Sequence, residues 1–130
     1  MSARRLVITA RRRPYPVALV SLDHFGYEPA GSLAPGTVLD DPSLSLYCLD
    51  PAGRRAVFTR AAPGTDLAAA PFLFQAQYDT ATELVVVDTA DLAGLAARVT
   101  LPPSRLVLLH SVGRCGSTLV GQALAATAGV

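Results

Sequence analysis

The residues best suited to chemistry gather in one short segment near the C-terminal end of the chain. They are Gly113, Arg114, Cys115, Gly116, Ser117 and Thr118. The glycines allow the backbone to curl and a ligand to approach it closely. The arginine contributes a permanent positive charge on a planar set of N–H donors, and the two hydroxyl residues add further donors. The segment therefore predicts a binding site for phosphate or sulfate.

The flanking segments indicate how this loop is positioned. Residues 106–109 form a short apolar run after Pro102-Pro103, which is typical of a buried parallel strand. From Ser117 onward the apolar residues follow helical spacing, so we expect a helix that begins there. The first N–H groups of a helix have no partner inside it, and the helix dipole favours an anion at that end.

Two common nucleotide-binding patterns are absent. A Walker A loop requires a lysine before its serine or threonine, and the chain contains no lysine. The dinucleotide pattern requires a glycine two residues before Gly113, where Ser111 stands instead. Hydrolysis of ATP or GTP by an ordinary P-loop is therefore disfavoured.

The stretch from Leu108 to Leu119 resembles the 5′-phosphosulfate-binding loop of the sulfotransferases that use 3′-phosphoadenosine 5′-phosphosulfate (PAPS). The resemblance implies that Arg114 contacts the 5′-phosphate and helps to stabilise the bridging oxygen as the catalytic residue. It implies that Gly116, Ser117 and Thr118 wrap this phosphate. Gly113 stands where proline is common and Cys115 where serine is common. The resemblance covers less than a quarter of the chain.

The strand signals in residues 1–100 predict a β-rich N-terminal module of an α/β chain. The resemblance implies that residues 104–130 are the first strand, loop and helix of a P-loop-like sulfotransferase domain. PAPS would be the co-substrate, without a metal, and a small-molecule hydroxyl or amine the acceptor. We expect the sulfotransferase domain to be truncated at Val130, with its catalytic base and 3′-phosphate site beyond that residue. Residues 1–130 alone are then expected to be inactive.

Other roles for the same residues stay open. The loop could be an αβ turn that binds nothing, and His110 could serve as a general base at its mouth. Cys115 could act as a nucleophile, because a helix N-terminus and a neighbouring arginine lower the pKa of a thiol. The histidines and cysteines show no metal-ligand spacing. The alternative functions are an atypical P-loop-like phosphotransferase and a non-enzymatic β-rich binding module.

The composition of the chain excludes several classes of protein. The chain has 130 residues, of which 51% are hydrophobic and 16% charged, so it should fold as a domain of ordinary size. No apolar run approaches the ~20 residues of a membrane span. A net charge of +1 gives no electrostatic case for binding nucleic acid or acidic membranes. Two cysteines fit a cytoplasmic protein, and the use of arginine alone among the long basic residues favours a GC-rich bacterial genome.

The first hundred residues show short strand signals separated by turns. Asp50-Pro51-Ala52-Gly53 predicts a hairpin turn, with Gly53 at a position of positive φ. Asp88 is suited to cap a helix whose apolar face includes Leu92 and Leu95. The expected strands are residues 5–9, 17–22, 45–49, 56–60, 72–78 and 83–87, and residues 26–43 are expected to be a loop.

Overall fold

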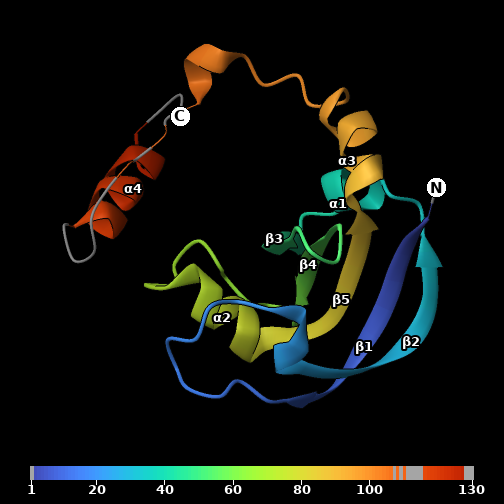
Figure 1. The fold of residues 1–130 in the computed structure, drawn as a ribbon. Coiled ribbons are helices and arrows are strands. Elements are labelled where there is room, and N and C mark those ends of the chain that lie inside the picture. The colour runs from blue at the N-terminus through green and yellow to red at the C-terminus, as the bar shows by residue number, and fades with distance from the viewer. Residues whose placement is uncertain (1, 107, 109, 111–115, 128–130) are drawn as a thin grey trace. The chain divides into compact units, whose positions relative to one another are not determined.

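The computed structural model describes residues 2–106, 108, 110 and 116–127, and the chain divides into two units. The sheet unit comprises Met1–Arg98, and the C-terminal unit comprises Val99–Val130. The fold is mixed α/β, with one antiparallel sheet and short helices (Figure 1). No helix within the described residues is long and apolar enough to cross a membrane.

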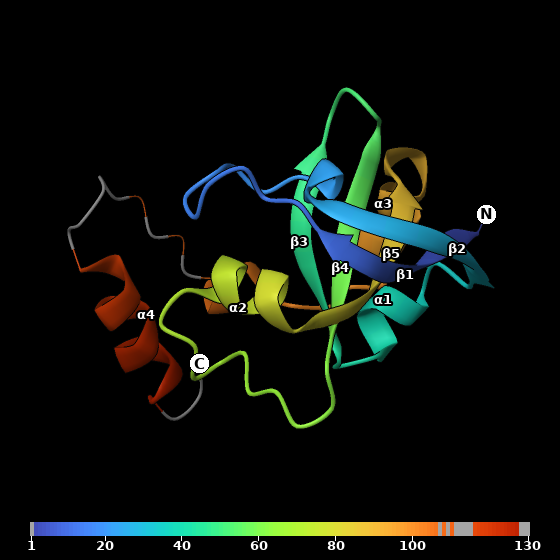
Figure 2. The same ribbon diagram turned by 90° about the horizontal axis from the view of Figure 1, so that it is seen from below.

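The sheet has five strands in the order β2-β1-β5-β4-β3, and every neighbouring pair is antiparallel. The first strand of the chain therefore lies beside the last, at the centre of the sheet (Figures 1 and 2). The strands are β1 (Ala3–Arg11), β2 (Phe25–Leu33), β3 (Leu44–Asp50), β4 (Arg55–Ala61) and β5 (Ala81–Asp88).

Short helices cover both faces of this sheet (Figure 2). One face packs against α2 (Leu73–Thr80) and the short helix η1 (Leu22–His24). The opposite face packs against α1 (Thr37–Asp40) and α3 (Thr89–Ala96). The C-terminal unit contains η2 (Pro103–Arg105) and α4 (Ser117–Ala125).

The central strand β5 explains why its sequence is continuously apolar. Leu84 and Val86 belong to the core on the α2 face, whereas Val85 and Val87 belong to the core on the α3 face. Successive side chains of a strand point to opposite faces, so a strand covered on both sides needs apolar residues at every position. The prediction of a doubly buried strand over residues 83–87 is confirmed.

The predicted hairpin is also confirmed, because β3 and β4 pair through the Pro51–Arg54 loop. The reason for its glycine differs from the prediction. Positive φ occurs at Arg54, not at Gly53. A Cβ atom on Gly53 would lie 2.4 Å from Asp50 Oδ2 and 2.7 Å from Arg55 Nε. The glycine therefore makes room for the Asp50–Arg55 ion pair, whose N···O distance is 2.7 Å.

Three segments differ from the predicted elements. The predicted strand 72–78 is the helix α2, which buries Gln77 and Tyr78 on adjacent positions while Phe72 and Phe74 are exposed. Residues 17–21 form no strand, and residues 26–43 contain β2 and α1 in place of a loop. In each case, contacts distant in sequence override the local pattern.

The helix α3 begins after Asp88 as predicted, but the aspartate side chain makes no capping hydrogen bond. Instead, the N–H of Thr89 and its hydroxyl group both donate to the carbonyl oxygen of Arg54, at 2.9 and 3.0 Å. The β3–β4 hairpin therefore fixes the start of α3.

Candidate functional site

The described part of the predicted anion loop is the start of α4. Gly116 precedes this helix with φ +82° and ψ 16°, which is the left-handed conformation. The first bond of the helix runs from the N–H of Val120 to the carbonyl oxygen of Gly116, at 3.1 Å. The N–H groups at positions 117–119 precede this first donor and so belong to the helix end that lacks internal partners.

The side chains at this helix start are accessible to a ligand. Ser117 is half-buried and Thr118 is exposed, and no side chain caps the helix. Within the described residues, no atom lies within 4 Å of the position that a Cβ on Gly116 would occupy. No described residue therefore closes that side of the Gly116 backbone, and its positive φ favours a glycine there.

Several predicted site residues lie outside the described residues: Gly113, Arg114 and Cys115. The preceding strand is not found where the structure describes it, since Leu106 and Leu108 belong to no regular element. His110 is exposed and likewise lies outside any helix or strand. Of the predicted arrangement, the described residues place only the helix that begins at Ser117 and the glycine before it.

Cys48, the one cysteine within the described residues, has no features of a nucleophile. Cys48 lies on β3 as a free, buried thiol, and burial raises its pKa. A protonated thiol is a poor nucleophile at neutral pH. Among the described residues, no group of histidine, cysteine and acidic side chains could hold a metal ion.

The sheet unit carries an ionic network that the sequence did not reveal. Arg5 on β1 donates to both carboxylate oxygens of Glu83 on β5, and the Nε of Arg60 on β4 lies 3.1 Å from Glu83 Oε2. Arg60 continues to Asp41 Oδ2 at 2.5 Å and to Ser43 Oγ at 2.7 Å. The network joins three strands and the turn before β3.

These contacts favour the charged forms of both acids. Hydrogen bonds from Ser43 and then Arg60 lower the pKa of Asp41 from its usual 3.8 to about 2. The hydrogen bond from Arg5 is the largest cause of the lowered pKa of Glu83, with Arg60 contributing further. Each guanidinium has an acidic partner, so the network serves the fold and offers no vacant cation to an anionic ligand.

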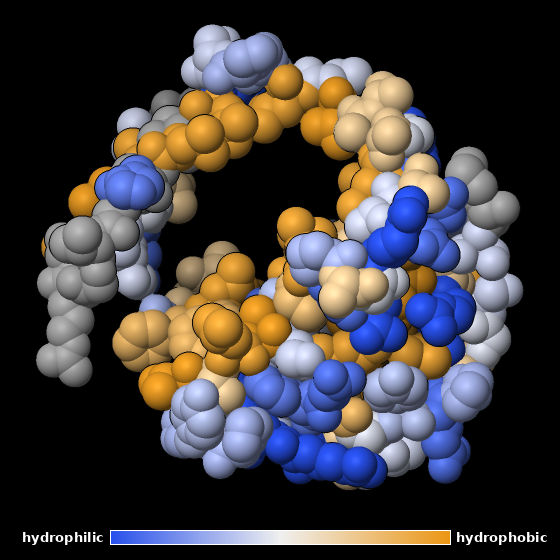
Figure 3. All heavy atoms as spheres, viewed as in Figure 1, coloured by the Kyte–Doolittle hydropathy of each residue, from blue (hydrophilic) through white to orange (hydrophobic). Residues whose placement is uncertain are grey.

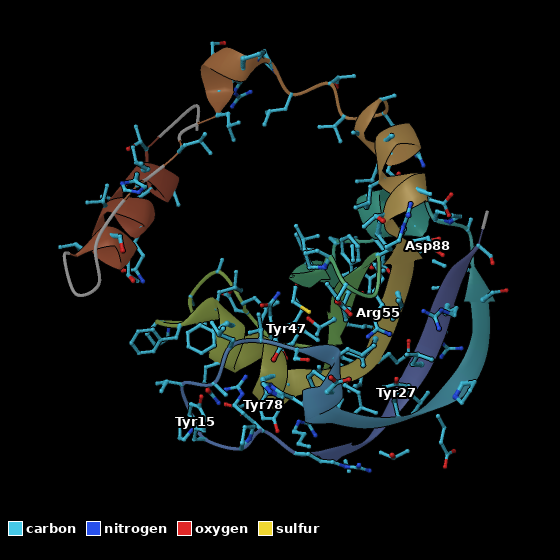
Figure 4. The ribbon with its side chains drawn as sticks, viewed as in Figure 1. Tyr15, Tyr27, Tyr47, Arg55, Tyr78 and Asp88 are labelled. Carbon is cyan, nitrogen blue, oxygen red and sulfur yellow. The ribbon has the colours of Figure 1, made fainter. Side chains whose placement is uncertain are left out.

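A second cluster surrounds Arg13, on the face of the sheet that packs against α2. Its guanidinium carbon lies 3.8 Å from the centre of the Tyr78 ring, and Nη1 lies 2.5 Å from Gln75 Oε1. Its Nη2 donates to the hydroxyl oxygen of Tyr47 at 3.3 Å. Tyr47 and Tyr78 lie on the α2 side of the sheet (Figure 4). The run of three arginines at residues 11–13 was the available sequence signal for this cluster.

Comparison of the chain with protein-family models, curated proteins and solved structures gave no match.

Proposed function

We propose that the chain contains the donor-binding loop of a sulfotransferase that moves a sulfuryl group from PAPS to a hydroxyl or amine acceptor. The observation that supports this proposal best is the start of α4 at Ser117, directly after a glycine with positive φ. Residues 108–119 resemble a phosphosulfate-binding loop, and such a loop requires a helix that begins directly after a glycine. A left-handed glycine ahead of a helix N-terminus lets successive backbone N–H groups converge on an anion.

The proposed chemistry is an in-line displacement at sulfur. The oxygen or nitrogen of the acceptor forms a bond to sulfur and gives its proton to a general base, while the bond from sulfur to the bridging oxygen of the 5′-phosphate breaks and adenosine 3′,5′-bisphosphate leaves. Arg114 donates charge-assisted hydrogen bonds to this phosphate, and its positive charge offsets the negative charge that grows on the bridging oxygen. The backbone N–H groups and hydroxyls of Ser117 and Thr118 hold the same phosphate. The protein contributes chiefly position and charge.

The test is the binding of adenosine 3′,5′-bisphosphate, the product that PAPS leaves behind, measured by isothermal titration calorimetry. Arg114→Ala should weaken binding about 10- to 150-fold, since charge-assisted hydrogen bonds contribute about 1.5–3 kcal/mol. Arg114→Lys should recover part of this loss, because lysine keeps the charge but not the planar set of donors. Arg4→Ala, an exposed arginine on β1, serves as the matched control and should bind as the native chain does.

The same titration separates the alternatives. Tighter binding of ATP than of the bisphosphate would favour an atypical phosphotransferase. No binding of either nucleotide by a folded chain would contradict the proposal and favour a non-enzymatic module. Cys115→Ser should change the affinity little if the backbone N–H at that position makes the contact, and a large effect would point to the thiol.

A further inference from the structure

The two edges of the sheet differ in how they are protected. The edge strand β2 contains Pro29, which has no N–H to donate, Gly31 at φ +104°, and two irregularities in its register with β1. Such features hinder the pairing of an edge with another chain. The edge strand β3 contains no proline or glycine, and within the described residues it pairs only with β4 (Figures 1 and 2). It therefore has backbone N–H and C=O groups on its open side that no other strand pairs.

A bulge lies in the middle of this edge strand. The register with β4 passes from Leu46 opposite Phe58 to Cys48 opposite Val57, so Tyr47 has no partner on β4. Tyr47 and Cys48 both belong to the core on the α2 face. Two successive side chains therefore point to the same face, which interrupts the alternation of a regular strand.

The exposed leucines of β3 lie on the other face, on either side of the bulge. Leu46 is opposite Phe58, which packs against the core on the α3 face. Leu49 is opposite Ala56, whose neighbour on β5 is Val87 of the same core. Residues directly opposite each other in an antiparallel pair share a face. Leu46 is 47% exposed and Leu49 is 60% exposed, so both are accessible on the α3 face of the edge.

The faces of β3 follow an order that is symmetric about its bulge. Ser45 lies on the α2 face, where its hydroxyl oxygen accepts a hydrogen bond from Gln77 on α2 at 2.8 Å. Asp50 follows Leu49 and so returns to the α2 face by alternation. From Ser45 to Asp50 the order is α2, α3, α2, α2, α3 and α2. Antiparallel pairing with a second β3 therefore matches the faces along the whole strand only when it is centred on the bulge.

This single register brings compatible side chains together. Leu46 of one copy lies opposite Leu49 of the other, and the symmetry repeats this apolar pair. Asp50, the one charged residue of β3, is paired with Arg55 at 2.7 Å and lies opposite the neutral hydroxyl group of Ser45 of the other copy. No like charges of the two strands face each other. The carbonyl oxygen of Leu46 accepts one hydrogen bond from α2, at 2.9 Å, and its second lone pair stays available.

We propose that two copies of the chain associate through β3, which pairs antiparallel with the β3 of the second copy about the bulge. The two five-stranded sheets then form one continuous sheet. The occupant of the edge is a second copy because the match of faces, the leucine pairs and the absence of opposed charges are properties of β3 paired with itself. The proposal is independent of the function proposed for the anion loop.

The test is analytical ultracentrifugation of the full chain over a range of concentrations. The native chain should sediment as a dimer that dissociates on dilution. The double variant L46K/L49K places lysines opposite each other in the proposed register, so its dissociation constant should rise about tenfold or more. The variant L46K/L49E places lysine opposite glutamate, so it should dimerise about tenfold more tightly than L46K/L49K. Because both variants lose the same leucines, this difference reports the register and not a loss of folding.

The matched control is Phe72→Ser, at the N-terminal end of α2, where apolar side chains also gather at the surface (Figure 3). Phe72 is 62% exposed, as Leu49 nearly is, and its replacement should leave the dimer unchanged. Circular dichroism should show that every variant keeps the native fold. A chain that is monomeric at every concentration, equal dimerisation by L46K/L49K, or no recovery in L46K/L49E would overturn the proposal. Loss of the dimer in Phe72→Ser alone would assign self-association to α2 and contradict it.

Discussion

The sheet unit and the C-terminal unit use apolar residues in different ways. In the sheet unit, each side chain from Leu84 to Val87 is buried in one of two cores. In the C-terminal unit, α4 has no buried residue, and Leu119 is 70% exposed. Packing therefore accounts for the residue types of the central strand. The residue types at the start of α4 are those that the proposed phosphate site would use.

The proposal gives arginine a different use in each unit. Arg5 and Arg60 are held by carboxylates between strands, where they stabilise the sheet. The proposed role of Arg114 requires the opposite, a cation whose partner is the ligand. The comparison predicts that substitutions in the sheet unit change stability and that substitutions in the loop change binding.

The largest expected effect is that of Leu84→Ala, which removes a fully buried side chain at the centre of the sheet. Large-to-small substitutions in cores cost about 2–5 kcal/mol, so the midpoint of urea unfolding should fall substantially. The matched control is Leu119→Ala on the exposed side of α4, which should change the free energy of unfolding by about 0.5 kcal/mol or less. Equal effects of the two variants would remove the distinction between the units.

A smaller loss of folding stability is expected from Gln77→Leu. Gln77 is 2% exposed, and its amide donates to Ser45 Oγ at 2.8 Å and to the carbonyl oxygen of Leu46 at 2.9 Å. Leucine of similar size would leave this carbonyl oxygen without its side-chain donor, at a cost of about 1–3 kcal/mol. The matched change Gln122→Leu on exposed α4 should be nearly neutral in the same urea measurement.

The acids of the ionic network predict how stability depends on pH. The pKa of Asp41 is about 2 in the folded chain and near 4 when unfolded, so its stabilisation is complete above pH 4 and is lost as the pH falls to 2. Glu83 shifts in the same direction. Asp41→Asn should lower the free energy of unfolding at pH 7 on the order of 1 kcal/mol, allowing for solvent screening, and should have no effect near pH 2.

The control for this pH series is Asp88→Asn, because the Asp88 side chain is exposed and caps nothing. Its unfolding curve should keep the pH dependence of the native chain. If Asp41→Asn were equally destabilising at every pH, the loss would come from packing and not from the charge of Asp41.

The smallest effect on stability is expected from Gly116→Ala. Alanine pays a penalty of about 1 kcal/mol in the left-handed conformation, which this glycine occupies outside the sheet unit. The free energy of unfolding of the sheet unit should therefore be unchanged. The affinity for adenosine 3′,5′-bisphosphate should fall about fivefold, since the start of α4 would shift. Unchanged affinity would show that the backbone at Gly116 does not shape the site.

The strand and turn signals that depend on local chemistry predicted much of the sheet. Residues 83–87 were recognisable because a strand buried on both faces needs an apolar residue at each position, and the hairpin because Pro51 and Gly53 bracket a turn. The prediction that residues 72–78 form a strand was wrong. The alternation of Phe72, Phe74 and Tyr78 is compatible with a strand, but the burial of Gln77 beside Tyr78 depends on contacts with β3.

The ionic network could not be predicted, because it joins residues whose separation along the chain reaches 78 positions. Its partners became neighbours only through the order of the strands. In the candidate site, the position of the helix start followed from local chemistry, since a glycine before Ser117 and apolar residues at helical spacing are both local signals. The ligand itself rests on the resemblance of the loop.

The central claim is that the loop before α4 binds the phosphate while the sheet unit supports the fold. The most direct test follows the backbone amide signals of the chain by NMR during titration with adenosine 3′,5′-bisphosphate. We predict that the amides of Gly116, Ser117 and Thr118 shift with one saturating curve, and that Arg114→Ala moves this curve to a concentration about 10- to 150-fold higher. The amides of Leu84 and Val86 should stay unchanged. Shifts confined to the sheet unit, or an unchanged curve in Arg114→Ala, would contradict the account.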